Sequence, residues 1–226
     1  HQKIALIARN GAGKTSLLNI ITGNDTPDEG RVVSRNGIHI AFLPQQPRLD
    51  PDLTVEETIF ASGNTTLKII QRYEKALQNP TDTDAYQKAF EQMDIHNAWD
   101  FETQYKQILS RLKLDDLDQK TATLSGGQKK RLALATALIN KPDILILDEP
   151  TNHLDLESIT TFNNALKNFK GTVIFTTHDH EFAQTVANRV IELTPNGIID
   201  KFMTFDGYMD DTGIKAQRNK MYSIVV

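Results

Sequence analysis

Residues 8–16 read "ARNGAGKTS", and this stretch decides the fold because of what lies on either side of it. The apolar run 4–8 predicts a buried strand, and the apolar spacing of residues 17–21 predicts a helix. A glycine-rich turn between a strand and a helix is the setting of a phosphate-binding loop of the form G-x-x-x-x-G-K-[ST]. Residues 13–15 match that pattern, but position 8 is alanine where the pattern has glycine.

The loop supplies groups suited to a triphosphate. Its backbone N–H groups can point at phosphate oxygens, and the positive end of the following helix favours the same anion. Lys14 would neutralise the β- and γ-phosphates, while the Thr15 hydroxyl would coordinate Mg²⁺. The predicted nucleotide-binding residues are Asn10, Gly11, Ala12, Gly13, Lys14, Thr15 and Ser16. Taken alone, the same loop could be a glycine-rich turn that only caps a helix.

Ala8 leaves two structural alternatives open. If the backbone needs a positive φ there, alanine costs about 1–2 kcal/mol. If the position only needs close packing, the added methyl group displaces the strand or the loop. Neither alternative removes the N–H groups or Lys14, so we expect the nucleotide site to persist.

Composition sets the outer bounds. The chain has 226 residues, 39% hydrophobic and 24% charged, which suits one ordinary soluble domain or a domain with a subdomain. Its longest apolar run, "LALATALI" (132–139), falls short of the roughly 18 residues that a membrane helix needs. The absence of cysteine excludes disulfides and thiolate metal sites and fits a reducing cytoplasm. A net charge of −4 predicts no DNA partner and limits any nucleic-acid contact to a local patch.

Two kinds of pattern divide the chain. Short buried strands alternate with helices over 1–50 and 120–210, which predicts an α/β core with a largely parallel, doubly wound sheet. Residues 51–119 carry helical spacing and predict an inserted helical subdomain, and 211–226 form a tail. The segment "GRVVSRNGIHIAFLPQQP" (30–47) predicts a hairpin of two short strands around an Asn-Gly turn, followed by a glutamine-bearing loop.

Two further motifs add chemistry to the core. "ILILDEP" (144–150) predicts a strand with Asp148 and Glu149 at its carboxyl end, the edge where such sheets bind ligands. Asp148 suits a Mg²⁺-directed carboxylate, and Glu149 suits the base that polarises water. "LSGGQ" (124–128) precedes a helix whose N-terminus forms a second anion site. A second copy of the domain could bring that site to the same γ-phosphate.

Together these motifs resemble, in order, those of the ATP-binding cassette (ABC) family of P-loop NTPases. The resemblance identifies residues 10–16 as the Walker A loop, Gln45 in "FLPQQP" as the Q-loop, Leu124, Ser125, Gly126, Gly127 and Gln128 as the signature, "LILDEP" as Walker B, Asp155 in "TNHLD" as the D-loop and His178 in "TTHDHEF" as the H-loop. His180 is the competing histidine, which we interpret as a solvated helix residue.

The resemblance implies an ATPase that works as a head-to-tail dimer. ATP would lie between Walker A of one domain and the signature of the other. Gln45 would sense Mg²⁺ and water and join Thr15 and Asp148 at the metal, His178 would hold the γ-phosphate, and Asp155 would link the two sites. Each of these two residues also has a purely structural alternative. Gln45 could be a polar loop residue, and His178 could be a hydrogen-bonding group at a strand end.

Within the family, "EPTNHLD", "LPQQPRLDPDLTVEETIF" and "NAWDFETQYKQIL" resemble the F subfamily. That resemblance implies a cytoplasmic protein of two cassettes that acts on ribosomes, with rRNA or tRNA as partners. The run 129–131 (Lys-Lys-Arg) could contact RNA, but we interpret it as a solvated helix face. The alternative functions are the nucleotide-binding subunit of a transporter and an ATP-gated binding module without turnover.

Two departures from the family concern the chain as a whole. Members carry antiparallel strands before Walker A, with an aromatic residue that stacks on adenine, and this chain begins after them, so we expect weak base stacking. We therefore interpret the chain as a single truncated cassette. Residues up to about 143 resemble one F-subfamily branch and residues 156–211 another, which suggests a composite joined within "LILDEPTNHLDLE".

Overall fold

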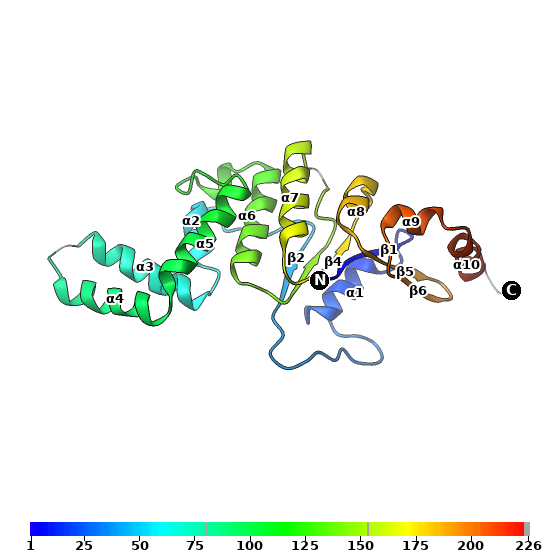
Figure 1. Ribbon diagram of the computed structural model, residues 1–226, viewed down its shortest axis with the longest axis horizontal. Helices are drawn as coiled ribbons and strands as arrows, with labels where there is room; N and C mark the ends of the chain where they lie inside the picture. The colour runs from blue at the N-terminus through cyan, green and yellow to red at the C-terminus, as the bar shows by residue number, and fades with distance from the viewer. Residues whose placement is uncertain (80, 153, 224–226) are drawn as a thin grey trace. The chain divides into compact units, whose positions relative to one another are not determined.

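The computed structural model describes residues 1–79, 81–152 and 154–223 (Figure 1). The chain divides into two compact units, one formed by His1–Pro47 with Lys141–Val226 and the other by Arg48–Asn140. No helix within the described ranges is both long enough and apolar enough to cross a bilayer.

A mainly parallel sheet forms the centre of the first unit. Among its described residues the strands lie in the order β2-β3-β4-β1-β5-β6, and every neighbouring pair is parallel except β5 and β6. Their bounds are β1 Lys3–Ala8, β2 Ile40–Leu43, β3 Ile144–Leu147, β4 Thr172–Thr176, β5 Arg189–Thr194 and β6 Gly197–Lys201. This topology confirms the predicted fold class.

Helices cover both faces of this sheet. They are α1 Lys14–Ile21, α7 Leu156–Asn168, α8 His180–Val186, α9 Phe205–Asp210 and α10 Thr212–Tyr222. Figure 1 shows α1 on one face and α7 and α8 on the other. Leu18 of α1 packs with Leu6 and Ile146, and all three are buried. On the opposite face, the rings of Phe175 and Phe182 meet edge to face at 5.1 Å.

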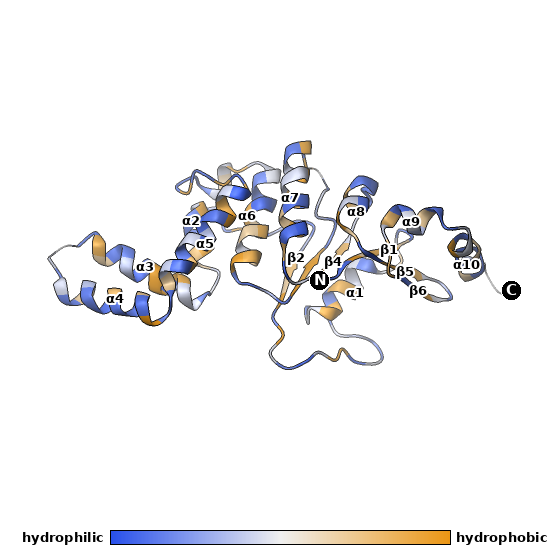
Figure 2. Ribbon diagram, in the orientation of Figure 1, coloured by the Kyte–Doolittle hydropathy of each residue, from blue (hydrophilic) through white to orange (hydrophobic). Residues whose placement is uncertain are grey.

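The strand residues show why the sheet is buried. β3 is wholly apolar and β4 has three apolar residues between two threonines, and Figure 2 colours the sheet accordingly between more polar helices. Side chains alternate between the two faces of a strand. Ile146 therefore faces α1, and the side chain two positions later, Asp148, is directed to the same face.

The predicted hairpin at 30–47 is wrong. Only its second half forms a strand, β2, which pairs in parallel with β3 rather than with its own neighbour. Residues 31–35 are irregular and exposed, and Val33 keeps 77% of its surface in solvent. The Asn36-Gly37 turn is present, with φ +80° at the glycine. An isolated two-stranded hairpin buries too little surface to be stable, whereas β3 offers a partner inside the core.

Strand β6 and helices α9 and α10 complete the sheet's far edge. The sequence pattern assigns residues 211–226 to a tail, and within that segment α10 folds as a helix docked on β5. The anchor is Glu192 of β5, whose side chain is 2% exposed. Arg218 pairs with it at 2.7 Å, and the hydroxyls of Tyr208 and Tyr222 donate to it at 2.5 and 3.0 Å. Burial and this hydrogen bond raise the pKa of Tyr208 well above its usual range, so it remains a donor.

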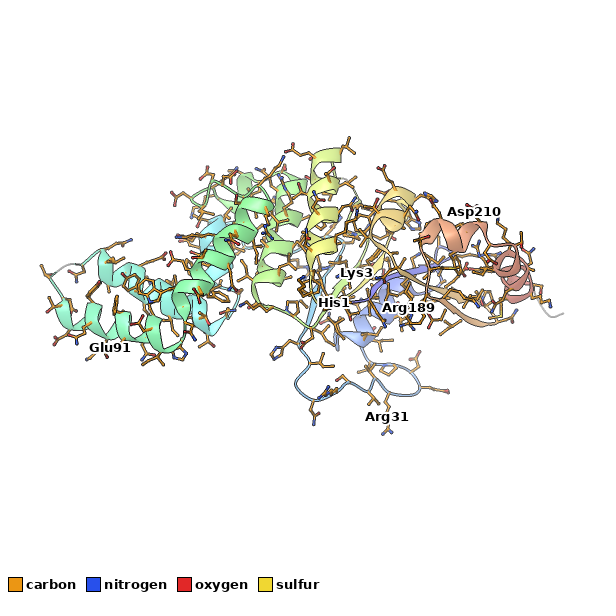
Figure 3. The ribbon with its side chains drawn as sticks, viewed as in Figure 1. His1, Lys3, Arg31, Glu91, Arg189 and Asp210 are labelled. Atoms are coloured by element: carbon orange, nitrogen blue, oxygen red, sulfur yellow. The ribbon has the colours of Figure 1, made fainter. Side chains whose placement is uncertain are left out.

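The amino ends of the central strands are held by charged side chains (Figure 3). Lys3 Nζ donates to the carbonyls of Phe169 and Gly171 at 2.7 and 3.1 Å, and burial lowers its pKa to about 8. On the neighbouring strand, Arg189 pairs with Asp200 of β6. These contacts lie at the sheet edge opposite the loop that follows β1.

The second unit is helical, and besides the segment 51–119 it includes residues 120–140, which the sequence pattern assigns to the α/β core. Its elements are α2 Val55–Phe60, α3 Thr65–Leu77, α4 Thr83–Ile95, α5 Ala98–Arg111, the 3₁₀ turn η1 Thr121–Thr123 and α6 Gly126–Ile139. Tyr73, Phe90 and Trp99 bring α3, α4 and α5 together, with ring centroids 4.9 to 6.4 Å apart.

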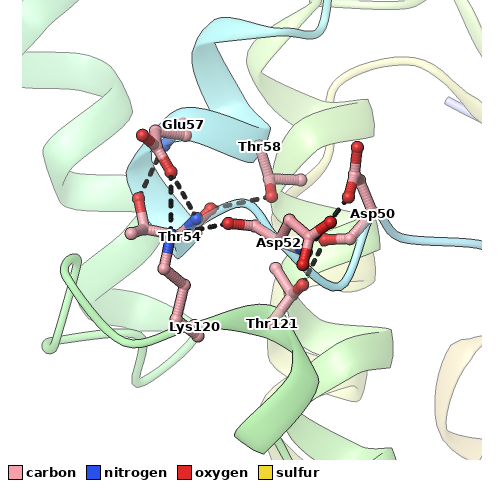
Figure 4. Close-up of polar contacts among 7 residues, drawn as sticks. All are labelled: Asp50, Asp52, Thr54, Glu57, Thr58, Lys120 and Thr121. Atoms are coloured by element: carbon pink, nitrogen blue, oxygen red, sulfur yellow. Dashed lines mark hydrogen bonds and ion pairs between the residues drawn. The ribbon is translucent and has the colours of Figure 1, made fainter.

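Polar contacts fix the start of α2 (Figure 4). Thr54 caps the helix, accepting from the Glu57 N–H at 3.1 Å while Glu57 accepts from the Thr54 N–H at 2.7 Å. Lys120 donates to the Asp52 carbonyl at 2.6 Å, and Thr121 donates to the Asp50 carbonyl. These bonds connect the entry of the helical unit to the segment that leads into α6.

We expect Arg218→Met to lower the free energy of unfolding by about 2–3 kcal/mol, because it leaves the buried Glu192 carboxylate without its cation. The two tyrosine hydroxyls and the 27% exposure of Arg218 hold the cost below the upper range for buried pairs. Adding Glu192→Gln to Arg218→Met should restore part of the loss in urea denaturation. If the double variant lost as much unfolding free energy as the two single variants added together, Glu192 and Arg218 would not act as a pair, and the proposed anchor would be wrong.

Candidate functional site

The loop after β1 has the backbone of a phosphate-binding turn. Gly11 and Gly13 take φ values of +77° and +84°, and α1 begins at Lys14. A Cβ at Gly13 would meet no atom within 4 Å, so backbone conformation rather than space favours glycine there. The Ala12 N–H donates to the Arg9 carbonyl at 3.2 Å and closes the turn. The first N–H groups of a helix have no partner within the helix, so those of α1 are available to an anion at the loop.

Ala8 occupies ordinary extended backbone. It is the last residue of β1 and pairs with Leu193 of β5. The positive-φ alternative for this position is therefore wrong, and alanine carries no backbone strain there. Its carbonyl accepts a hydrogen bond from Lys14 Nζ at 3.4 Å, which holds the lysine side chain back over its own loop.

The two carboxylates after β3 lie at the carboxyl edge of the sheet. Asp148 is 3% exposed, and its Oδ2 accepts from the Thr15 hydroxyl at 2.9 Å. Its Oδ1 accepts from the Thr176 hydroxyl at 2.7 Å. Residues separated by more than a hundred positions thus meet at one carboxylate.

Glu149 has an unusual backbone conformation. Its φ is +46°, a region that non-glycine residues rarely adopt without support from their surroundings. Its N–H donates to the Thr176 hydroxyl at 3.0 Å. Its Oε1 lies 3.2 Å from Nε2 of His178, whose side chain is 56% exposed. The Glu149 side chain is 10% exposed, so one carboxylate oxygen is held by the histidine at the entrance to the site.

The two histidines of the 176–180 segment have different neighbours. His178 reaches Glu149, whereas His180, the first residue of α8, pairs with Asp206 of α9 at 3.0 Å. His180 also keeps 64% of its side chain exposed.

Gln45 lies in a loop, and Asp155 lies at the start of a helix. Gln45 is exposed two residues after β2. Asp155 caps α7, accepting from the Ser158 N–H at 2.7 Å and from its hydroxyl at 3.2 Å. His153 of the same "TNHLD" motif lies outside the described residues.

The signature motif belongs to the second unit. Ser125 caps α6 by accepting from the Gln128 N–H at 3.2 Å, and Gln128 Oε1 accepts from the Ser125 N–H at 2.9 Å. Leu124 and Gly127 are buried, while Gly126 is exposed. In the following run, Lys130 is 7% exposed, so the interpretation of residues 129–131 as a solvated face is wrong for its central residue.

Two features of the site were not predicted from sequence. Thr176 bonds both Asp148 and the Glu149 backbone, and only the register of β3 with β4 reveals this. Arg9 stacks on the ring of Tyr222 in α10 at 4.1 Å. A pocket of about 500 Å³ lies beside that pair and reaches His178. The sequence carried no local signal for the first feature, because it depends on pairing between strands that are distant in the chain.

Comparisons with known proteins identify the family of the chain. The family model described as "ABC transporter" matches residues 1–152. YfmR of Bacillus subtilis (strain 168), an uncharacterized ABC transporter ATP-binding protein, is 40% identical over 200 residues, which cover 85% of this chain and 32% of YfmR. The energy-dependent translational throttle protein EttA of Escherichia coli (strain K12) is 39% identical over 199 residues, which cover 84% of this chain and 36% of EttA. The chain therefore spans about a third of the length of these curated relatives.

A solved structure of the ATP-binding subunit of an ABC transporter superposes on the chain with a TM-score of 0.69. The two are 21% identical, and the match covers 97% of this chain and 85% of that one. At this identity the likeness supports the fold alone. From the family match, the chain belongs to the ATP-binding cassette family, and its relative EttA is a member of the F subfamily, which agrees with the resemblance of its motifs.

Proposed function

We propose that this chain binds ATP with Mg²⁺ and hydrolyses it to ADP and phosphate. The observation that carries the proposal is the meeting of Thr15, Asp148 and Glu149 at one edge of the sheet, beside the start of α1. A phosphate-binding turn, a metal-directed carboxylate and a second carboxylate are the parts that hydrolysis of a nucleoside triphosphate requires.

Each residue has a distinct task in this reaction. Lys14 and the N–H groups of the loop and first turn hold the β- and γ-phosphates. Glu149 accepts a proton from the attacking water, and His178 holds its carboxylate oriented and donates toward the γ-phosphate. Gln45, two residues after the end of β2, would contribute a polar group to the metal and water once nucleotide is bound. Here Gln45 acts from an exposed loop position.

The donors at the site fit Mg²⁺. Thr15 and Asp148 offer hard oxygen atoms 2.9 Å apart. Within the described ranges there is no group of three or more histidine, cysteine, aspartate or glutamate side chains that would form an all-protein metal cage. Mg²⁺ commonly binds through one or two protein oxygens together with substrate phosphates. When bound, it would neutralise charge on the phosphates, and Thr15 and Asp148 would hold it.

The signature motif completes the proposal. ABC cassettes work in pairs, and we propose that Ser125 and Gly126 of a second cassette bind the γ-phosphate opposite Lys14. The cap of α6 is consistent with this, because the serine fixes the helix start while Gly126 stays exposed. Asp155, at the start of α7, would transmit the state of one site to the other. The two compact units would together make one cassette, with the helical segment 51–119 inserted into the α/β core.

For the longer protein we propose an F-type role in translation, with ribosomal RNA or tRNA as partner. Similarity to EttA, a translational throttle protein by name, supports this class. The transporter alternative rests on the names of YfmR and of the superposed ATP-binding subunit. Co-sedimentation of the longer protein with ribosomes in Mg-ATP separates the two, because a transporter subunit should remain in the supernatant.

Ala8→Gly should change ATP affinity by less than about twofold, because Ala8 sits in unstrained strand backbone. Gly13→Ala should weaken binding roughly tenfold, since a left-handed alanine costs about 1–2 kcal/mol. Titration calorimetry with a nonhydrolysable ATP analogue measures both. Tighter binding by Ala8→Gly of tenfold or more would show that the methyl group does obstruct the loop.

Glu149→Gln should reduce hydrolysis by roughly 10²–10⁴-fold, because the amide keeps the shape of the side chain but cannot accept the proton. ATP affinity should stay the same or rise, since one negative charge near the triphosphate is removed. A phosphate-release assay gives the rate, and light scattering after size exclusion in Mg-ATP reports pairing of cassettes.

Lys14→Ala is the matched control for Glu149→Gln, because it should abolish turnover by abolishing binding. Hydrolysis at the unmodified rate by Glu149→Gln would overturn the assignment of the base. A Glu149→Gln protein that binds ATP without turnover yet never pairs would leave the base in place and count against the sandwich.

A further inference from the structure

Thr176 is a buried hydroxyl at the centre of the proposed site. It ends β4, the strand between β3 and β1, and is 0% exposed. In the register of β3 with β4, Leu147 is opposite Phe175, so Asp148 follows in line with Thr176. Both side chains are therefore directed to the face that α1 covers.

The two hydrogen bonds of Thr176 have only one consistent proton arrangement. A backbone N–H can only donate, so the hydroxyl oxygen accepts from Glu149 at 3.0 Å. The single hydroxyl proton then goes to Asp148 Oδ1 at 2.7 Å. This leaves Oδ2 as the oxygen that faces Thr15. One hydroxyl thus fixes the rotation of the first carboxylate and the backbone of the second.

At position 176 an aliphatic residue of similar size would pack in β4 equally well. The other residues of β4 before the terminal threonine are mainly apolar, and β-branched side chains suit a central strand. Packing alone therefore does not require a hydroxyl. Its two partners do, because Asp148 is 3% exposed and the Glu149 backbone is held at φ +46°.

We propose that Thr176 is a positioning residue for the metal carboxylate and the base, acting through Asp148 and the Glu149 backbone. This inference rests on the proposed Mg²⁺-dependent ATP hydrolysis. Residues that orient a metal ligand through a hydrogen bond commonly change metal affinity by 10–100-fold when the bond is lost. The effect should fall on Mg²⁺ and on the chemical step, and little on the contacts of the loop with the phosphates.

The test compares Thr176→Val, which is nearly the same size and lacks the hydroxyl, with Thr176→Ser, which retains it. Binding of a fluorescent nonhydrolysable ATP analogue is titrated with Mg²⁺ and repeated in EDTA, using the full chain. Thr176→Val should raise the half-saturating Mg²⁺ concentration about tenfold or more and lower kcat by at least about tenfold. Thr176→Ser should remain within about threefold of the unmodified protein, and affinity in EDTA should change by less than about twofold.

Thr161→Val is the matched control. Thr161 is also a buried threonine of the first unit, and its hydroxyl donates to the Glu157 carbonyl within α7. Its replacement removes a hydroxyl of similar burial without touching either carboxylate of the site. It should leave the Mg²⁺ titration unchanged.

Three outcomes would overturn the inference. Thr176→Val could titrate with Mg²⁺ like the unmodified protein, or it could lose binding equally in EDTA, which would make the hydroxyl a general support of the fold. If Thr176→Val does not fold, Thr176→Cys replaces it in the test, because its thiol is only a weak donor. Thr176→Cys should then raise the half-saturating Mg²⁺ concentration by an intermediate amount, and an unchanged concentration would overturn the inference. A failure of the proposed function looks different, because binding by the unmodified protein would then be independent of Mg²⁺.

Discussion

The hydrogen bond between the Thr15 hydroxyl and Asp148 is the interaction on which the site depends. It joins the first turn of α1 to the end of β3, two elements that the sequence separates by the entire helical unit. The bond is possible because parallel strands end at one edge of the sheet and α1 begins at that edge. Leu18, Leu6 and Ile146 pack directly beneath and fix the distance between helix and sheet. Hard oxygen donors are thereby presented beside the free N–H groups of a helix N-terminus.

Strain at Glu149 is the second constraint on the site. A positive φ at a non-glycine residue costs on the order of 1–3 kcal/mol and persists only where neighbours enforce it. Here the Glu149 N–H donates to the Thr176 hydroxyl, and the Glu149 carboxylate pairs with His178. The same backbone turn carries Glu149 out of the line of β3, so the two adjacent carboxylates have different environments. Both are buried, but Asp148 is bonded to Thr15 and Thr176, whereas Glu149 lies beside the exposed His178.

The sequence predicted the elements and side chains that belong to short local motifs. The loop at 8–16 predicted its own strand and helix, and "ILILDEP" predicted the strand that delivers Asp148, because both depend on local spacing. The hairpin at 30–47 failed because its first strand had a local pattern but no partner, while β2 found a better one in β3. Thr176 and the positive φ of Glu149 could not be read from sequence, since they follow from pairing between strands. The docking of α9 and α10 through Glu192 likewise depends on contacts over 16 to 30 positions.

The most direct measurement is an experimental structure of the chain with Mg²⁺ and a nonhydrolysable ATP analogue. The account predicts a triphosphate wrapped by residues 10–16, with Mg²⁺ bound by the Thr15 hydroxyl in place of the hydrogen bond to Asp148. Asp148 should remain bonded to Thr176 through its other oxygen. A nucleotide bound elsewhere would contradict the central claim. So would a nucleotide at the loop with no metal beside it and with the hydrogen bond between Thr15 and Asp148 intact.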